Sequence, residues 1–166
     1  MESRVRGYLV TVIGLFVLGS GHLVYAGCGS QPGDEAAVIA ARATADATCT
    51  AMGAGCSNAS NHGAYVSCVA GVAKMLSSGT NPTLPKNCKG AVKKCAAHST
   101  CGKPDEVTCC FTGKSGPKCK NAKSAADCSG KGGTPTLDPM NTSCCSNTHP
   151  LTDNACMASP SGAFLN

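Results

Sequence analysis

Cysteine is the residue with the greatest capacity for chemistry in this chain, which has fourteen cysteines, all after residue 27. No two of them have the Cys-x-x-Cys spacing of many zinc sites and thioredoxin-like redox centres. An even number of cysteines behind an apolar leader is typical of exported domains held together by disulfides. We therefore expect disulfide pairing of Cys28, Cys49, Cys56, Cys68, Cys88, Cys95, Cys101, Cys109, Cys110, Cys119, Cys128, Cys144, Cys145 and Cys156.

Two pairs of cysteines are adjacent in sequence, Cys109-Cys110 and Cys144-Cys145. A disulfide between neighbours closes a strained eight-membered ring, which would give it the character of a switch. Adjacent cysteines more often bond to two different partners. We expect that arrangement here.

Residues suited to other chemistry are sparse after the leader, where His62, His98 and His149 are the only histidines. A metal site with thiolate ligands would need unpaired cysteines, which oxidising compartments remove. The strings for haem attachment and for a serine nucleophile elbow do not occur after residue 26. The sequence therefore predicts a protein that is not an enzyme, with no metal and no cofactor.

The first 26 residues have the layout of a secretory signal peptide. Arg4 and Arg6 give a positive start, residues 8–18 are nearly all apolar, and Ala26 is a small residue at the expected cleavage point. The apolar run is only about half of the roughly 20 residues that span a bilayer. We expect a secreted, periplasmic or cell-surface protein with no transmembrane span after cleavage.

An alternative form of export is a lipid anchor. The residues Tyr25-Ala26-Gly27-Cys28 resemble the end of a bacterial lipoprotein signal, in which the cysteine is acylated. That signal usually has an aliphatic residue where Tyr25 stands, and acylation of Cys28 would leave an odd number of cysteines. Lipoprotein anchoring at Cys28 stays open beside cleavage after Ala26.

Amphipathic patterns predict three helices in the first half of the mature chain. They are residues 35–52, residues 62–76, and a third that starts near Pro85 and carries Cys88 and Cys95. Asp34 and Asn61 are candidate caps for the first two. Each helix has a cysteine on its apolar face, which is the arrangement needed to staple a three-helix bundle from inside.

The pattern changes after Pro104. Residues 107–111 are typical of a short strand, to which residues 118–120 are expected to pair across a turn. The rest is rich in Gly, Pro, Ser, Asn and Lys, with a helical turn at 124–128 and an extended piece at 142–145. We expect cross-links rather than a core to hold this region.

The fold class expected is small, disulfide-rich and mainly α, with a three-helix bundle followed by an irregular cystine-rich region with short β pieces. The divisions are a signal peptide (1–26), a disulfide-stapled helical subdomain (27–101) and an irregular cysteine-rich subdomain (102–166). Large side chains are scarce after the leader, where there is no Trp. Disulfides, at about 2–4 kcal/mol each, are expected to compensate for the weak core.

Four runs of residues carry a resemblance to a known group of proteins. They are Asn61-His62-Gly63-Ala64-Tyr65-Val66-Ser67-Cys68-Val69, Lys86-Asn87-Cys88-Lys89-Gly90-Ala91-Val92, Cys95-Ala96-Ala97-His98-Ser99-Thr100-Cys101-Gly102-Lys103 and Val107-Thr108-Cys109-Cys110. Over about residues 60–145 the chain resembles the uncharacterised, secreted cysteine-rich proteins predicted from environmental bacteria. The resemblance implies an extracellular compartment, helical cysteines followed by a Cys-Cys strand, and a bacterial source, but no mechanism.

Lysines are concentrated between Lys86 and Lys131, where ten of them stand against three acidic residues. Such asymmetry draws a protein to anionic envelope polymers or lipid head groups. Nucleic acid is not expected, because stacking aromatic residues are missing. The candidates for anion binding are Lys86, Lys89, Lys93, Lys94, Lys118, Lys120 and Lys123. A solubilising lysine face is the simpler alternative.

The function expected is therefore that of a secreted or envelope-associated structural or binding module that is not catalytic. Protease inhibition is the alternative, because residues 111–118 lie between Cys110 and Cys119, where disulfides would brace an exposed loop. Gly113 and Gly116 make that loop softer than a good inhibitor needs.

Overall fold

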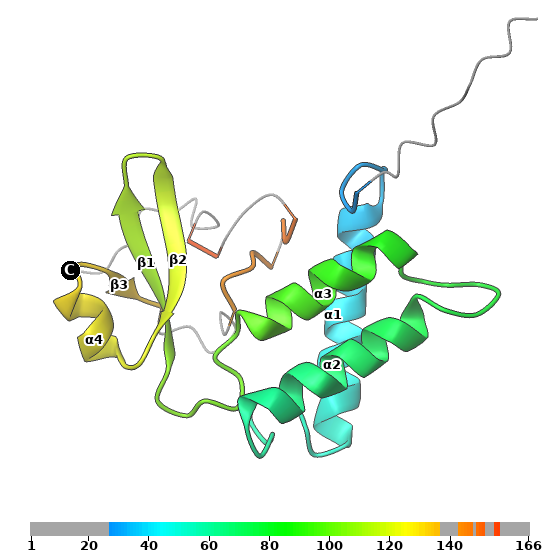
Figure 1. The fold of residues 1–166 in the computed structure, drawn as a ribbon, viewed down its shortest axis with the longest axis horizontal. Helices are drawn as coiled ribbons and strands as arrows, with labels where there is room; N and C mark the ends of the chain where they lie inside the picture. Colours follow the sequence, from blue (N-terminus) through cyan, green and yellow to red (C-terminus); the bar gives the residue numbers. More distant parts are fainter. Residues whose placement is uncertain (1–26, 137–142, 148, 152–154, 157–166) are drawn as a thin grey trace, which may run out of the picture.

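The computed structural model describes residues 27–136, 143–147, 149–151 and 155–156 (Figure 1). The predicted signal peptide, residues 1–26, lies outside the described residues, as does Thr142 of the predicted extended piece. Three helices occupy one end of the molecule, and a small sheet with a short helix occupies the other (Figure 1).

The helical part consists of α1 (Asp34–Ala51), α2 (His62–Leu76) and α3 (Lys89–Ala97), the last preceded by a 3-10 turn, η1 (Lys86–Cys88). Asn61 caps α2 as predicted, because its Oδ1 accepts a hydrogen bond from the Ala64 N–H at 2.9 Å. The cap predicted for α1 is wrong. Gly33 is the N-cap, and the Asp34 carboxylate instead accepts hydrogen bonds from N–H groups of the preceding loop. No helix within the described ranges is both long and apolar enough to cross a membrane.

One core lies among α1, α2 and α3, which contact one another pairwise. Most of its side chains are small, so the helices can approach closely; the buried ones include Val38, Ala45, Val69, Val92 and Leu84. Met52 and Met75 are 61% and 63% exposed, because both lie at the C-terminal end of a helix, beyond the packed faces. The pairwise contacts are those that a bundle requires, and the three-helix bundle itself stays a prediction.

The second part contains a regular three-stranded antiparallel sheet in the order β2-β1-β3. Strands β1 (Val107–Gly113) and β2 (Gly116–Ala122) form a hairpin that pairs Cys110 with Cys119, and β3 (Thr134–Pro135) lies on the other side of β1. Helix α4 (Ala125–Gly130) follows β2 and is capped by the Ser124 hydroxyl.

The fold class is therefore disulfide-rich with mixed helices and sheet. The short β pieces predicted for the second part are present, and they form one regular sheet. The β2 residues include Gly, Pro and Lys, which have low strand propensity, so the sequence pattern suggested only short pieces. Pairing with β1 and the Cys119–Cys144 disulfide supply the order that the β2 residues themselves do not favour. A small core also exists there, formed by Cys109, Cys128 and Ala122.

All fourteen cysteines are paired, as predicted. The disulfides are Cys28–Cys88, Cys49–Cys68, Cys56–Cys101, Cys95–Cys145, Cys109–Cys128, Cys110–Cys156 and Cys119–Cys144. Adjacent cysteines bond to different partners, which is also confirmed. The sulfur of Cys28 is bonded to Cys88 and cannot carry an acyl anchor at the same time, so the structure disfavours lipoprotein anchoring.

The pairing follows the two parts of the molecule. Three disulfides lie within residues 28–101 and three within residues 109–156. Cys95–Cys145 joins the two sets. This cross-link fixes the helices relative to the sheet.

Candidate anion-binding groove

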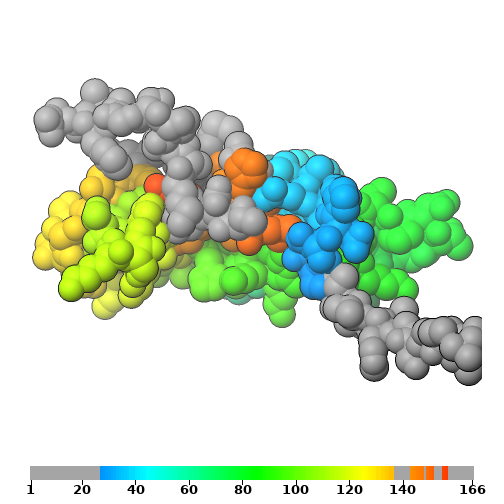
Figure 2. Space-filling view, turned by 90° about the horizontal axis from the view of Figure 1, so that it is seen from above, coloured from blue at the N-terminus to red at the C-terminus, as the bar shows by residue number. Residues whose placement is uncertain are grey.

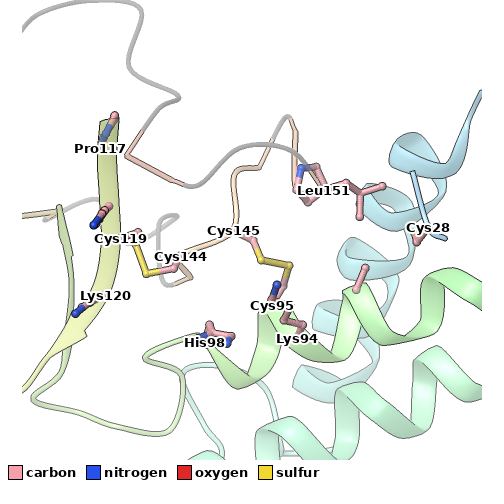
Figure 3. A pocket seen from close by; sticks show the side chains of 13 residues that line it. Cys28, Lys94, Cys95, His98, Pro117, Cys119, Lys120, Cys144, Cys145 and Leu151 are labelled. Carbon is pink, nitrogen blue, oxygen red and sulfur yellow. A yellow bond between two sulfur atoms is a disulfide. The ribbon is translucent and has the colours of Figure 1, made fainter. Parts of the chain in front are cut away.

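Residues 143–147, here called the clamp segment, run between the helices and the sheet (orange in Figure 1). Cys144 is bonded to Cys119 of β2, and Cys145 is bonded to Cys95 of α3 (Figure 3). The Ser143 hydroxyl donates to the carbonyl of Cys95 at 2.8 Å, and Ser143 forms a β-bridge with Ser99. Two neighbouring cystines thus tie two different elements to one short segment.

The clamp segment is also held by α1, beside which it lies at the surface (Figure 2). Arg42 Nη1 donates to the Ser146 carbonyl at 2.9 Å, and Nη2 donates to Asn147 Oδ1 at 3.3 Å. Burial lowers the pKa of Arg42, while the charge of Asp46 acts in the opposite direction. Asp46 Oδ1 in turn accepts a hydrogen bond of 2.7 Å from the Tyr65 hydroxyl, so a helix-borne polar cluster positions the segment.

We expect the Tyr65 phenol to stay protonated at pH values at which a free tyrosine ionises. Burial, followed by the hydrogen bond to Asp46, raises the pKa of Tyr65 well above the usual 10.0. A raised folded-state pKa gives stability that is present below about pH 10 and is lost as the pH rises. The free energy of unfolding should fall by at most about 1.4 kcal/mol per pH unit above that point, and less steeply in Tyr65→Phe. Parallel curves for the two proteins in alkaline urea titrations would contradict this assignment.

A groove with a volume of about 590 Å³ lies between α3 and β2 (Figure 3). Both cystines of the clamp segment line it, together with the cationic or titratable side chains of Lys94, His98, Lys118 and Lys120. No carboxylate is among the described residues that line it. None of the salt bridges among the described residues involves these three lysines, so no carboxylate seen in the structure neutralises them.

The structure divides the seven predicted lysines, all of which are exposed. Lys94, Lys118 and Lys120 come together at the groove. Lys93 instead lines a separate hollow between α2 and α3, and Lys86 and Lys89 belong to η1 and the start of α3. Lys123 lies beyond β2, where its backbone N–H donates to the Asp127 carboxylate.

His98 and the clamp cystines were not among the residues predicted from sequence for an anion site. The available signal was the Cys144-Cys145 pair, because adjacent half-cystines with different partners must draw two elements together. The partners themselves cannot be deduced from cysteine spacing.

Other clusters fit a ligand less well. A hollow of about 900 Å³ over the Cys56–Cys101 disulfide is larger, but its charged lining is of mixed sign and includes Asp46, Lys103 and Glu106. Lys103 Nζ and Glu106 Oε2 form a salt bridge of 2.9 Å. By contrast, the described lining of the α3–β2 groove contains lysines and no carboxylate, so its electrostatic field has one sign.

The sulfur atoms of Cys28 and Cys88 lie close to the Asp34 carboxylate, as they would in a metal centre. The two sulfurs are bonded to each other, and the carboxylate accepts hydrogen bonds from the N–H groups of Gly29 and Gln31. Thiolates, the form of cysteine that binds metal, are not present in a disulfide. This cluster is a cross-linked loop that leads into α1.

Comparison with known proteins yields no matching family model, no matching curated protein and no matching solved structure. The resemblance to secreted cysteine-rich bacterial proteins stays a prediction. Any assignment of function therefore depends on the chemistry of the groove.

Proposed function

We propose that this protein is an exported binding module that is not catalytic, and that its α3–β2 groove binds an anionic polymer of the cell envelope. One observation carries the proposal: Lys94, His98, Lys118 and Lys120 line one cavity, and no carboxylate is among its described lining residues. Clefts lined by charges of one sign concentrate counter-ions. Lysine, a hydrated point charge on a flexible stem, suits a polymer with repeated negative groups.

The disulfides support the proposal because they hold the lysines in place before a ligand arrives. Lys94 is next to Cys95, and Lys118 and Lys120 flank Cys119. Both of these cysteines are bonded to the clamp segment. The backbone of each groove lysine is thus pinned one residue from a cross-link, which reduces the ordering cost of binding. In this proposal the three helices act as a bundle whose α3 forms one wall of the site.

The inhibitor hypothesis receives less support from the geometry of residues 111–118. These residues form the end of a hydrogen-bonded hairpin in which Phe111, Thr112 and Gly113 are paired with β2. Only Lys114 and Ser115 lie in the turn between the strands. A bound inhibitor loop offers its own backbone to a protease, whereas the backbone of Phe111, Thr112 and Gly113 is already paired with β2. A trypsin-inhibition assay tests the hypothesis directly.

The test of the proposed function compares two triple variants with the same change in charge. Lys94→Gln/Lys118→Gln/Lys120→Gln removes the groove lysines, and Lys86→Gln/Lys89→Gln/Lys93→Gln removes lysines of the same predicted cluster that do not line it. At about 1 kcal/mol per lysine near an anionic surface, the first variant should bind polygalacturonate about 100-fold more weakly. The second should lose much less, because salt screens charges beyond about 8 Å. Affinity is measured at several salt concentrations.

Equal losses in the two variants would show that only net charge matters. The lysines would then form a solubilising face, and those of the edge strand β2 would also discourage edge-to-edge aggregation.

A further inference from the structure

A second hollow adjoins the groove on the sheet. It has a volume of about 320 Å³ and is lined by Phe111, Lys118, Lys120, Asn121, Ala122 and Lys131. Lys118 and Lys120 therefore line both hollows. Among the described residues β2 is an edge strand of its sheet, so its long lysine side chains can serve a ligand on either side.

The second hollow differs from the groove because it contains an aromatic ring. Phe111 is paired with Lys118 across the hairpin, so the two side chains are on the same face of the sheet. The ring is half-buried and packs against the core formed by Cys109, Cys128 and Ala122. It also lies against Gly133, where an added Cβ would be 2.8 Å from Cε1. The ring is thus fixed at the wall of a cavity whose other sides carry lysines.

We infer that the two hollows form one continuous binding track and that its ligand is an acidic polysaccharide. This inference rests on the proposed function and names its ligand. A sugar ring packs its apolar C–H face on Phe111, since ligand sites combine an aromatic surface with a few placed polar groups. Carboxylate or sulfate groups on that sugar and its neighbours pair with Lys118, Lys120 and Lys94. Lys131, at the far end, contributes less, because its Nζ is 2.9 Å from the Asp127 carboxylate.

Other polyanions match this track less well. Inorganic polyphosphate has no apolar ring to place on Phe111. Single-stranded nucleic acid stacks successive bases on several neighbouring aromatic side chains, whereas the described lining offers one phenyl ring, Phe111, in one hollow and one imidazole, His98, in the other. A lipid bilayer offers head groups in a plane, while Phe111 forms part of a recessed wall.

The experiment measures the affinity of the full-length chain, oxidised, for oligogalacturonate, inorganic polyphosphate, oligothymidylate and phosphatidylglycerol vesicles at one ionic strength. Phe111→Leu removes the ring but keeps an apolar contact with the Cys109–Cys128 disulfide, and Phe111→Tyr keeps the ring. We expect Phe111→Leu to weaken oligogalacturonate binding about fivefold and to leave polyphosphate binding unchanged, with Phe111→Tyr close to the wild type. Lys131→Gln should weaken oligogalacturonate binding more than Lys114→Gln, since Lys114 lies in the hairpin turn and lines neither hollow.

Two results separate this inference from the proposed function. In the first, binding depends on salt and on the groove lysines, but it is equally tight for polyphosphate, nucleic acid or vesicles and is unchanged by Phe111→Leu and Lys131→Gln. That result overturns the acidic polysaccharide as the ligand and leaves the groove proposal standing. No dependence on Lys94, Lys118 and Lys120 for any polyanion overturns both. If the disulfide map shows that Phe111→Leu does not fold, the comparison of Lys131→Gln with Lys114→Gln tests the inference instead. Equal oligogalacturonate affinities of these two variants would overturn it.

Discussion

Replacing Cys95 and Cys145 together with alanine should lower the free energy of unfolding by about 2–4 kcal/mol and abolish tight polyanion binding. This disulfide joins residues 50 apart in sequence and is the one that links the helical cystines to the sheet cystines. Without it, the clamp segment keeps its bond to β2 through Cys119–Cys144 but loses its bond to α3. Hydrogen bonds, among them those of Ser143 and Arg42, then hold the clamp segment to the helices in place of a disulfide, so the two walls of the groove can separate more easily.

The control is the double alanine variant of Cys56 and Cys101, a disulfide with a similar sequence separation of 45 that does not line the groove. Urea unfolding should give comparable losses of stability for the two variants, since the closed loops have similar lengths. Binding to polygalacturonate should be lost only in the Cys95/Cys145 variant. Equal binding by both would mean that the clamp does not organise the site.

Gly102→Ala should destabilise the protein by about 3 kcal/mol. Gly102 has a φ of 71°, a conformation that costs side chains other than glycine about 1–2 kcal/mol. An added Cβ would also lie 2.6 Å from the backbone nitrogen of His62 and 2.7 Å from the carbonyl oxygen of Asn61. These are backbone atoms at the start of α2, so the clash can be relieved only by moving that helix end.

Gly53→Ala is the matched control for this prediction. Gly53 has a nearly equal φ of 73°, and an added Cβ there meets no atom within 4 Å. Gly53→Ala should lower the free energy of unfolding by the conformational cost alone, about 1–2 kcal/mol, as measured by urea unfolding. If Gly102→Ala were no more destabilising than Gly53→Ala, the result would contradict the close packing of Gly102 against the start of α2.

Local features of the fold were predictable from sequence. The bounds of α2 and its Asn61 cap follow from an amphipathic run behind a residue suited to accept the first free N–H groups. The β1–β2 hairpin follows from a β-rich run and a Gly-rich turn, although the strands are longer than predicted. These features depend on residues close in sequence.

The groove was not predictable, because it depends on pairings between distant cysteines. The lysine cluster shows the same limit. Lys93 and Lys94 are neighbours, but successive residues on an α-helix point about 100° apart, so only Lys94 reaches the groove. Lys118 and Lys120 reach it from a strand that the clamp disulfides bring beside α3. Charge counts along the chain cannot separate these lysines from the others.

The measurement that most directly tests the central claim is the NMR mapping of polyanion binding on the isotope-labelled, oxidised protein. Titration with oligogalacturonate should shift the backbone amide signals of the residues that line the groove, namely Lys94, Cys95, His98, Lys118, Cys119, Lys120, Cys144 and Cys145. The amides of Lys86, Lys89 and Lys93 serve as internal controls and should move little. Shifts concentrated at those three lysines, or spread evenly over all exposed lysines, would contradict a binding groove between α3 and β2.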